Sequence, residues 1–132
     1  MNRQQPNLSF DHEALARYNV LAINTGSTST KIAVYNGLTP VVEMSIAHST
    51  EELSQFKSVP EQYEWRKDVI LKVLGDKGFD IDTLSAVIGR GGLLRPIESG
   101  VYEVSDRMID DLRNANVQHA SNLGAMIASE IA

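Results

Sequence analysis

The chain has 132 residues, of which 42% are apolar and 22% charged, and its formal net charge is −5. This length suits one compact domain, and the acidic balance argues against a general nucleic-acid binder, which needs a basic face. The absence of cysteine excludes disulfides, thiolate catalysis and cysteine zinc sites, and it fits a reducing cytoplasm. No apolar stretch is long enough to span a membrane.

Residues 1–17 are predicted to form a polar N-terminal arm, or a short amphipathic helix over residues 11–17. They lack the apolar core of a secretion signal. The remaining residues, 18–132, are predicted to form one domain.

Three strands joined by short turns are predicted next, over residues 18–24, 31–37 and 39–49. The Asn36-Gly37 pair suits the positive φ angles of a tight hairpin. In the third strand Val42, Met44 and Ile46 share one face. Strands in this order form an antiparallel meander.

A helix is then expected, with Ser58 as its cap, Pro60 in its first turn, and Gly75 or Gly78 at its end. Its apolar side consists of Tyr63, Ile70, Val73 and Leu74. A fourth strand, residues 84–92, follows this crossover helix and should lie parallel to one of the first three.

The remaining residues predict a fifth short strand over 100–105, a helix over 105–115 and an Ala-rich helix over 119–132. Ser105 can cap the first of these helices, whose inward residues are Met108, Ile109 and Leu112. The last helix ends without a stop signal, which suggests a chain cut short, although an ordinary frayed terminus is an equal alternative.

The hydroxyl loop between the first two strands is a candidate phosphate site. Gly26 lets the backbone approach a ligand, and Lys31 adds charge if it points inward. Asn24 can orient an oxygen, and the hydroxyl groups belong to Ser27, Thr28, Ser29 and Thr30. The pattern is neither a Walker A loop nor a dinucleotide fingerprint. The alternative is a solvated turn whose hydroxyls bond nearby backbone.

Two further segments are candidates for a ligand site. Gly91 and Gly92 directly follow the fourth strand, and Arg90 can pair with a carboxylate or phosphate. His119 stands before the last helix, which Ser121 or Asn122 can cap, and it can donate to developing negative charge. The alternatives are a bulged turn with a surface arginine and a surface histidine. No role is expected for His12 or His48.

Four segments taken together resemble a known family: "LAINTGSTSTKIAVY", "AVIGRGGLLRPI", "GVYEVS" with "MIDDLR", and "HASNLGAMIA". They are similar to successive N-terminal motifs of butyrate kinase, a relative of acetate kinase in the sugar kinase, Hsp70 and actin superfamily. The resemblance covers residues 20–132. It implies a ribonuclease H-like, actin-like ATPase domain of the α/β class, with a mixed five-stranded sheet, an antiparallel meander and flanking helices.

The resemblance also implies a function, namely ATP-dependent phosphorylation of a short-chain carboxylate to an acyl phosphate, or the reverse, with Mg²⁺. It implies catalytic roles for Arg90 and His119 and substrate binding by Gly91 and Gly92. The implied phosphate and nucleotide site comprises Asn24, Gly26, Ser27, Thr28, Ser29 and Lys31. No metal ligand is assigned within this chain.

Butyrate kinases are far longer chains, so residues 18–132 are expected to be the N-terminal lobe of a two-lobed kinase whose second lobe is absent. Such a fragment is expected to be inactive, cytoplasmic, and free of nucleic-acid or membrane partners. It is also expected to be a homo-oligomer or to self-associate through an exposed last helix, whose apolar residues are Ala125, Met126, Ala128, Ile131 and Ala132. The alternatives are a non-catalytic actin-like module that binds phosphate or a partner, and a sugar-kinase-like domain.

Overall fold

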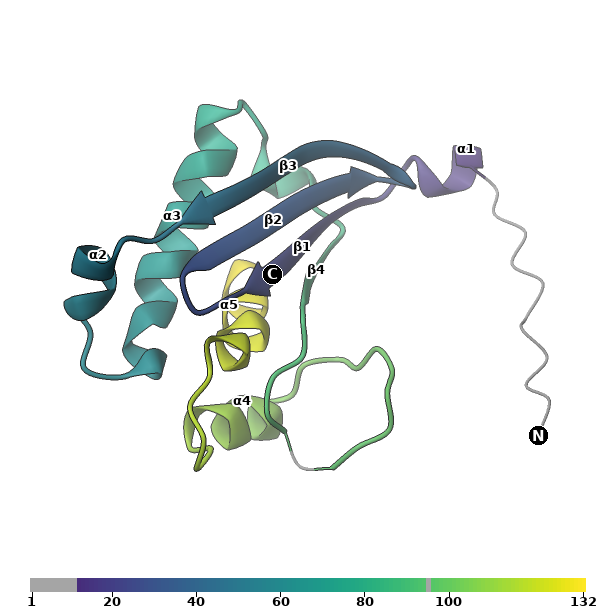
Figure 1. Ribbon diagram of the computed structural model, residues 1–132. Helices are drawn as coiled ribbons and strands as arrows, with labels where there is room; N and C mark the ends of the chain where they lie inside the picture. Colours follow the sequence, from purple (N-terminus) through teal and green to yellow (C-terminus); the bar gives the residue numbers. More distant parts are fainter. Residues whose placement is uncertain (1–11, 95) are drawn as a thin grey trace.

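The structure is a computed structural model that describes residues 12–94 and 96–132. Its centre is a four-stranded mixed sheet in the order β3-β2-β1-β4 (Figure 1). The strands are β1 (Asn19–Thr25), β2 (Ser29–Asn36), β3 (Thr39–Ala47) and β4 (Ala86–Gly89). β1, β2 and β3 form the predicted antiparallel meander, and β4 lies parallel to β1, as the crossover predicts.

The prediction of a fifth strand over residues 100–105 is wrong. Residues 100–104 have no regular structure, and Val101 is 84% exposed. This segment instead bonds locally, since the Tyr102 hydroxyl donates to the Glu98 carbonyl (2.7 Å). Apolar alternation alone does not make a strand, because a strand also requires pairing with a neighbouring strand.

Two helices cover one face of the sheet (Figure 1). They are α3 (Tyr63–Asp76) and α5 (Leu123–Ile131), and the core between them and the sheet contains Leu21, Ile23, Ile32, Val34, Ile70, Leu74, Leu123, Met126 and Ile127. The predicted inward face of α3 is therefore correct. Gly78, with φ of +73°, follows the end of α3, as a helix-terminating glycine should.

The shorter elements are α1 (His12–Leu15), α2 (Thr50–Ser54), α4 (Asp106–Arg113) and the 3₁₀ turns η1 (Val59–Gln62), η2 (Ile81–Thr83) and η3 (Ala120–Asn122). The arm is described only from residue 12 onward. Ser105 caps α4 as predicted, accepting from the Met108 amide (3.2 Å), whereas Ser58 makes no side-chain cap bond. No helix in the described ranges is both long enough and apolar enough to cross a membrane.

Two local predictions need correction. The hairpin between β2 and β3 turns at Gly37 and Leu38, because Asn36 pairs with Thr39; only Gly37 has positive φ (+59°). A glycine at the first central position is typical of type II′ turns. The helix α2 was missed, although Ser49 and Glu52 form a complete capping box, a pattern readable from the sequence.

The last helix is also less exposed than expected. Met126 and Ala128 are buried against the sheet, and Ala125 and Ile131 are half-buried. Part of the apolar surface that was expected to drive self-association is therefore buried within the protein, whereas Ala132 is exposed. Self-association stays a prediction without this support.

Backbone meets backbone where the end of β4 crosses α5. A Cβ atom on Gly89 would lie 2.4 Å from the carbonyl carbon of Gly124, and one on Gly124 would lie 2.7 Å from the Arg90 oxygen. Both distances are shorter than van der Waals contact, so the two glycines are needed for this approach. The contact brings the segment after β4 against the start of α5.

We predict that Gly89→Ala lowers the free energy of unfolding by about 1–3 kcal/mol, because α5 must move away from the sheet. The matched control is Gly75→Ala in α3, where a Cβ atom would meet nothing within 4 Å. That control should be neutral or stabilising, by up to about 1 kcal/mol, because alanine favours a helix. Urea denaturation measures the free energy of unfolding of both variants. Equal changes in the two variants would contradict the close contact between β4 and α5.

Candidate functional site

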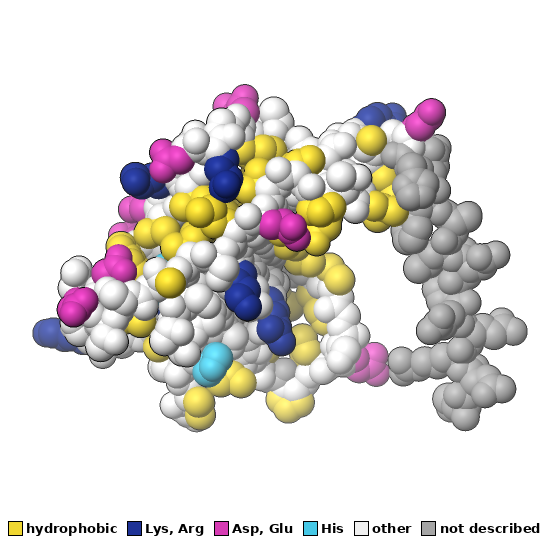
Figure 2. Space-filling model, turned by 45° about the horizontal axis from the view of Figure 1, so that its top comes forward, with side chains coloured by type: hydrophobic (Ala, Val, Ile, Leu, Met, Phe, Trp, Pro, Cys, Tyr) yellow, Lys and Arg dark blue, Asp and Glu magenta, His cyan; other side chains and the backbone are white. Residues whose placement is uncertain are grey.

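A hollow of about 360 Å³ lies where β1, β2 and β4 meet the start of η3. We call it the loop-end hollow. It is lined by Asn24, Thr25, Gly26, Ser29, Lys31, Arg90, Gly91, His119 and Ser121. These residues come from three segments far apart in the sequence, and seven of them were predicted as site residues. On the surface, basic side chains and a histidine gather in this hollow (Figure 2).

The hydroxyl loop, residues 26–30, forms one wall. The Gly26 amide donates to the Ser29 carbonyl (2.8 Å), which closes the turn between β1 and β2. Gly26 and Ser29 line the hollow, whereas Ser27 and Thr28 are exposed at the tip and do not line it. The amides of Ser27 and Thr28 make no hydrogen bond within the described part of the chain, so they are free to bind a ligand.

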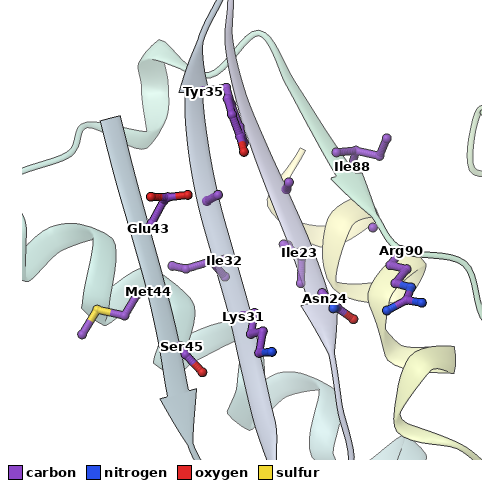
Figure 3. Close-up of a pocket in the computed structure, with 13 residues that line it drawn as sticks. Ile23, Asn24, Lys31, Ile32, Tyr35, Glu43, Met44, Ser45, Ile88 and Arg90 are labelled. Carbon is purple, nitrogen blue, oxygen red and sulfur yellow. The ribbon is translucent and has the colours of Figure 1, made fainter. Parts of the chain in front are cut away.

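Asn24 and Lys31 are register partners on adjacent strands. Their side chains lie on the sheet face opposite the core, and Lys31 is exposed. Figure 3 shows Asn24 between Lys31 and Arg90 at the same end of the sheet, and all three line the hollow. Lys31 therefore points into the candidate site, which strand alternation alone did not decide.

Arg90 directly follows β4, and its amide donates to the Ile23 carbonyl (2.9 Å), which fixes its backbone to β1. Its side chain is exposed and lines the hollow with Gly91. Gly92 does not line it. A Cβ atom on Gly92 would lie 2.7 Å from the Asn122 Cα, so this glycine permits close packing on η3 and does not contact the predicted ligand space.

His119 caps η3 with its own side chain. Its Nδ1 accepts from the Ser121 amide (3.1 Å), whereas Asn122 makes no such cap bond and instead accepts from the Leu93 amide (2.8 Å). Asn122 occupies the N-cap position of α5, as one of the two expected alternatives has it, but its side chain makes no cap bond there. Because an amide can only donate, Nδ1 is the acceptor, and the proton of the neutral ring is on Nε2. The exposed ring can thus donate from Nε2 to an anion.

Thr25 ties this histidine turn to the sheet. Its side chain is buried, and its hydroxyl donates to the Ala120 carbonyl (2.6 Å). The sequence motifs indicated no role for this threonine. In the structure it holds η3 against the end of β1.

Arg66 was missed by sequence reasoning and lies directly beneath the hydroxyl loop. Its side chain is fully buried, and its Nη1 donates to the carbonyls of Gly26 (2.8 Å) and Ser29 (3.1 Å). Gln62 accepts from both Nε (3.1 Å) and Nη2 (2.9 Å). The sequence did contain an indication of this buried arginine, since Arg66 falls at helical spacing between Tyr63 and Ile70 on the apolar side of α3.

His48, which had no expected role, continues this network. Its Nε2 lies 2.7 Å from the Thr30 hydroxyl, which also accepts from Arg66 (3.2 Å). The ring packs against Trp65, with centroids 4.6 Å apart. Burial, and then the positive charge of Arg66, lower the pKa of His48, so its ring is neutral at neutral pH.

A second hollow, of about 650 Å³, extends over the sheet face away from the core and shares Asn24, Lys31 and Arg90 with the first. We call it the sheet-face hollow. Its floor is largely apolar, with Ala22, Ala33, Tyr35 and Ile88 (Figure 3). Polar and apolar surface thus adjoin at the basic residues, an arrangement that suits a small molecule with one anionic end.

The described residues do not by themselves form a magnesium site. No group of three or more His, Asp or Glu side chains among them is placed to hold a metal ion, and no carboxylate lines the loop-end hollow. Mg²⁺ prefers carboxylate and phosphate oxygens.

Known proteins resemble the chain over most of its length. It is 51% identical to a probable butyrate kinase of Clostridium botulinum (strain Eklund 17B / Type B) over 116 residues, which are 86% of this chain and 32% of that protein. It is 52% identical to butyrate kinase 2 of Clostridium acetobutylicum over 118 residues, 88% of this chain and 33% of that protein. No family model matches the chain.

The chain therefore spans about a third of the length of the curated relatives it matches. The described residues form a mixed α/β fold with flanking helices, and its sheet has four strands rather than the expected five. The resemblance expected from the sequence motifs is confirmed: curated proteins similar to this chain are named butyrate kinases.

Proposed function

We propose that the chain is the phosphate-facing part of a butyrate kinase-like enzyme, which transfers the γ-phosphoryl group of ATP to a short-chain carboxylate and forms an acyl phosphate and ADP, reversibly. The observation that carries this proposal is the convergence of the hydroxyl loop, Arg90 and His119 on one hollow. The similarity to named butyrate kinases supports the same reaction.

Each group has a distinct role in this proposal. The loop amides and Lys31 bind phosphate oxygens, because free N–H groups and an ammonium both favour negative charge. Arg90 orients the carboxylate or the transferring phosphoryl group with its planar guanidinium. Nε2 of His119 donates to the oxygens on which charge develops. Little covalent chemistry is required of the protein, since phosphoryl transfer depends on positioning and charge stabilisation.

The acceptor's alkyl chain has a place in this scheme. When Arg90 binds the carboxylate group of the acceptor, the acceptor's alkyl chain can lie on the apolar floor of the sheet-face hollow, beside Ile88. Mg²⁺, if bound between the phosphates as in other kinases, would need only one or two protein carboxylates besides the phosphate oxygens. A cytoplasmic location stays a prediction.

The first prediction concerns the anion. Crystals soaked in sulfate or phosphate should show an ion against the backbone of residues 26–29, within reach of Lys31. In solution, the amide resonances of Ser27 and Thr28 should shift on titration with phosphate. The turn at Gly37 and Leu38, at the other end of β2, is the internal control and should not shift. A loop whose hydroxyls all turn to their own backbone and leave no room for an ion would contradict the proposal.

The second prediction concerns Arg90, in a longer protein that continues this chain to the length of its relatives. Arg90→Ala should lower kcat by roughly 100-fold or more with an unchanged melting temperature, because an exposed guanidinium contributes charge and not packing. Arg107→Ala, an exposed arginine on α4, is the matched control and should leave both unchanged. A large loss of melting temperature with normal turnover would assign Arg90 to structure.

The third prediction concerns the 132-residue chain alone. It should fold but show no detectable turnover with ATP, Mg²⁺ and butyrate. The described residues would contact the phosphate end of ATP from one side only, so the reacting groups would be poorly aligned. Loss of this alignment can remove about 7–11 kcal/mol of barrier reduction. Adding a separately expressed segment that corresponds to the rest of a relative should restore turnover. Robust activity of the short chain alone would overturn this part of the proposal.

A further inference from the structure

Arg66 is a buried cation that has no acidic partner among the residues that the structure describes. Lys67 pairs with Glu130 and Lys72 with Asp76, and neither pair involves Arg66. Its guanidinium contacts only neutral acceptors, namely backbone carbonyls, the Thr30 hydroxyl and the Gln62 amide oxygen. Burying a charge in this way is costly, and an apolar side chain of similar size often gives equal or greater stability.

The direction of these contacts determines the shape of the loop. Arg66 draws the carbonyl oxygens of Gly26 (2.8 Å) and Ser27 (3.5 Å) toward α3. In a planar trans peptide the C=O and the following N–H point in opposite directions. The amides of Ser27 and Thr28 must therefore point away from the core, where they are exposed and have no partner in the described chain.

We infer that Arg66 is a positioning residue for phosphate: it fixes the hydroxyl loop with its amides facing outward, and its uncompensated charge attracts the anion through the loop. The inference rests on the proposed function, because it assigns to the phosphate site a residue that does not itself contact the ligand. The dipoles of the intervening peptides align with the charge, carbonyls toward Arg66 and amides toward the anion.

The surroundings hold the guanidinium in one orientation. Gln62, one turn earlier on the same helical stretch, accepts from two of its nitrogens. The Thr30 hydroxyl accepts from Nη1 and also contacts His48, whose backbone amide donates to the Thr28 carbonyl (2.8 Å). The loop is thus held from β2, from α3 and from the segment after β3. A lysine could carry the charge but could not reach all of these acceptors with a planar fork.

The test is phosphate affinity, measured from the amide shifts of Ser27 and Thr28 at constant ionic strength and well below the melting temperature of each variant. Arg66→Met removes charge and donors at similar volume, and Arg66→Lys retains the charge alone. Leu74→Ala, a buried residue two turns further along α3 and away from the loop, is the control for lost stability. A purely structural role for Arg66 would affect melting temperature but not affinity in folded protein.

We expect Arg66→Met to weaken phosphate binding by roughly tenfold or more, because both charge and loop geometry are lost. Arg66→Lys should weaken it less, and Leu74→Ala should leave it unchanged despite a lower melting temperature. If Arg66→Met does not fold, the phosphate affinity of Arg66→Lys alone decides whether the inference holds. Wild-type affinity in the folded Lys and Met variants would overturn the inference and leave the proposed function standing. No phosphate binding by the wild-type loop would overturn both the inference and the loop's part in the proposed function.

Discussion

The close approach of β4 and α5 is the constraint on which the site depends. Gly89 and Gly124 let two backbones meet at a distance that any side chain would prevent. As a result, the residues after β4 and those before α5 converge on the end of β1, where Thr25 fixes η3 by a hydrogen bond. Arg90 and His119, which are 29 positions apart in the sequence, thereby line the same hollow. The site is thus a product of helix–sheet packing rather than of a single motif.

Much of the fold could be predicted because local signals agreed with one another. The meander follows from three apolar runs joined by short turns, and the parallel β4 follows from the intervening helix. The inward faces of α3 and α4 follow from helical spacing. The fifth strand failed because residues 100–104 have a strand-like composition without a partner, and pairing is a tertiary property.

The residues that line the site could be predicted from the sequence, but the residues that hold them in place could not. Residues that carry charge or hydroxyls next to glycines stand out in a sequence, as the hydroxyl loop and Arg90 do. Thr25 and Arg66 act through atoms more than 35 residues distant, so nothing in their immediate sequence indicates the partner. The capping role of His119 was likewise hidden, because a serine and an asparagine next to it are the more usual caps.

The cations around the site differ in how much solvent screens them. Lys31 and Arg90 are exposed, so their attraction for an anion falls within a Debye length of about 8 Å at physiological salt. Arg66 is fully buried, and its field passes through protein of lower effective dielectric, where the same charge acts more strongly. Burial lowers the pKa of Arg66, but arginine starts so far above neutrality that the charge persists.

This difference assigns separate tasks to the exposed and buried charges. Flexible side chains such as Lys31 can follow a phosphate group as it moves, but ordering them costs entropy each time. The loop amides under Arg66 need no such ordering, because their carbonyls are already bonded to a rigid guanidinium. Dipoles that are oriented before the ligand arrives require no reorganisation at the moment of reaction, and this is the condition under which electrostatic stabilisation is most effective. The cost of burying Arg66 without a carboxylate is then consistent with a loop built to hold its amides toward an anion.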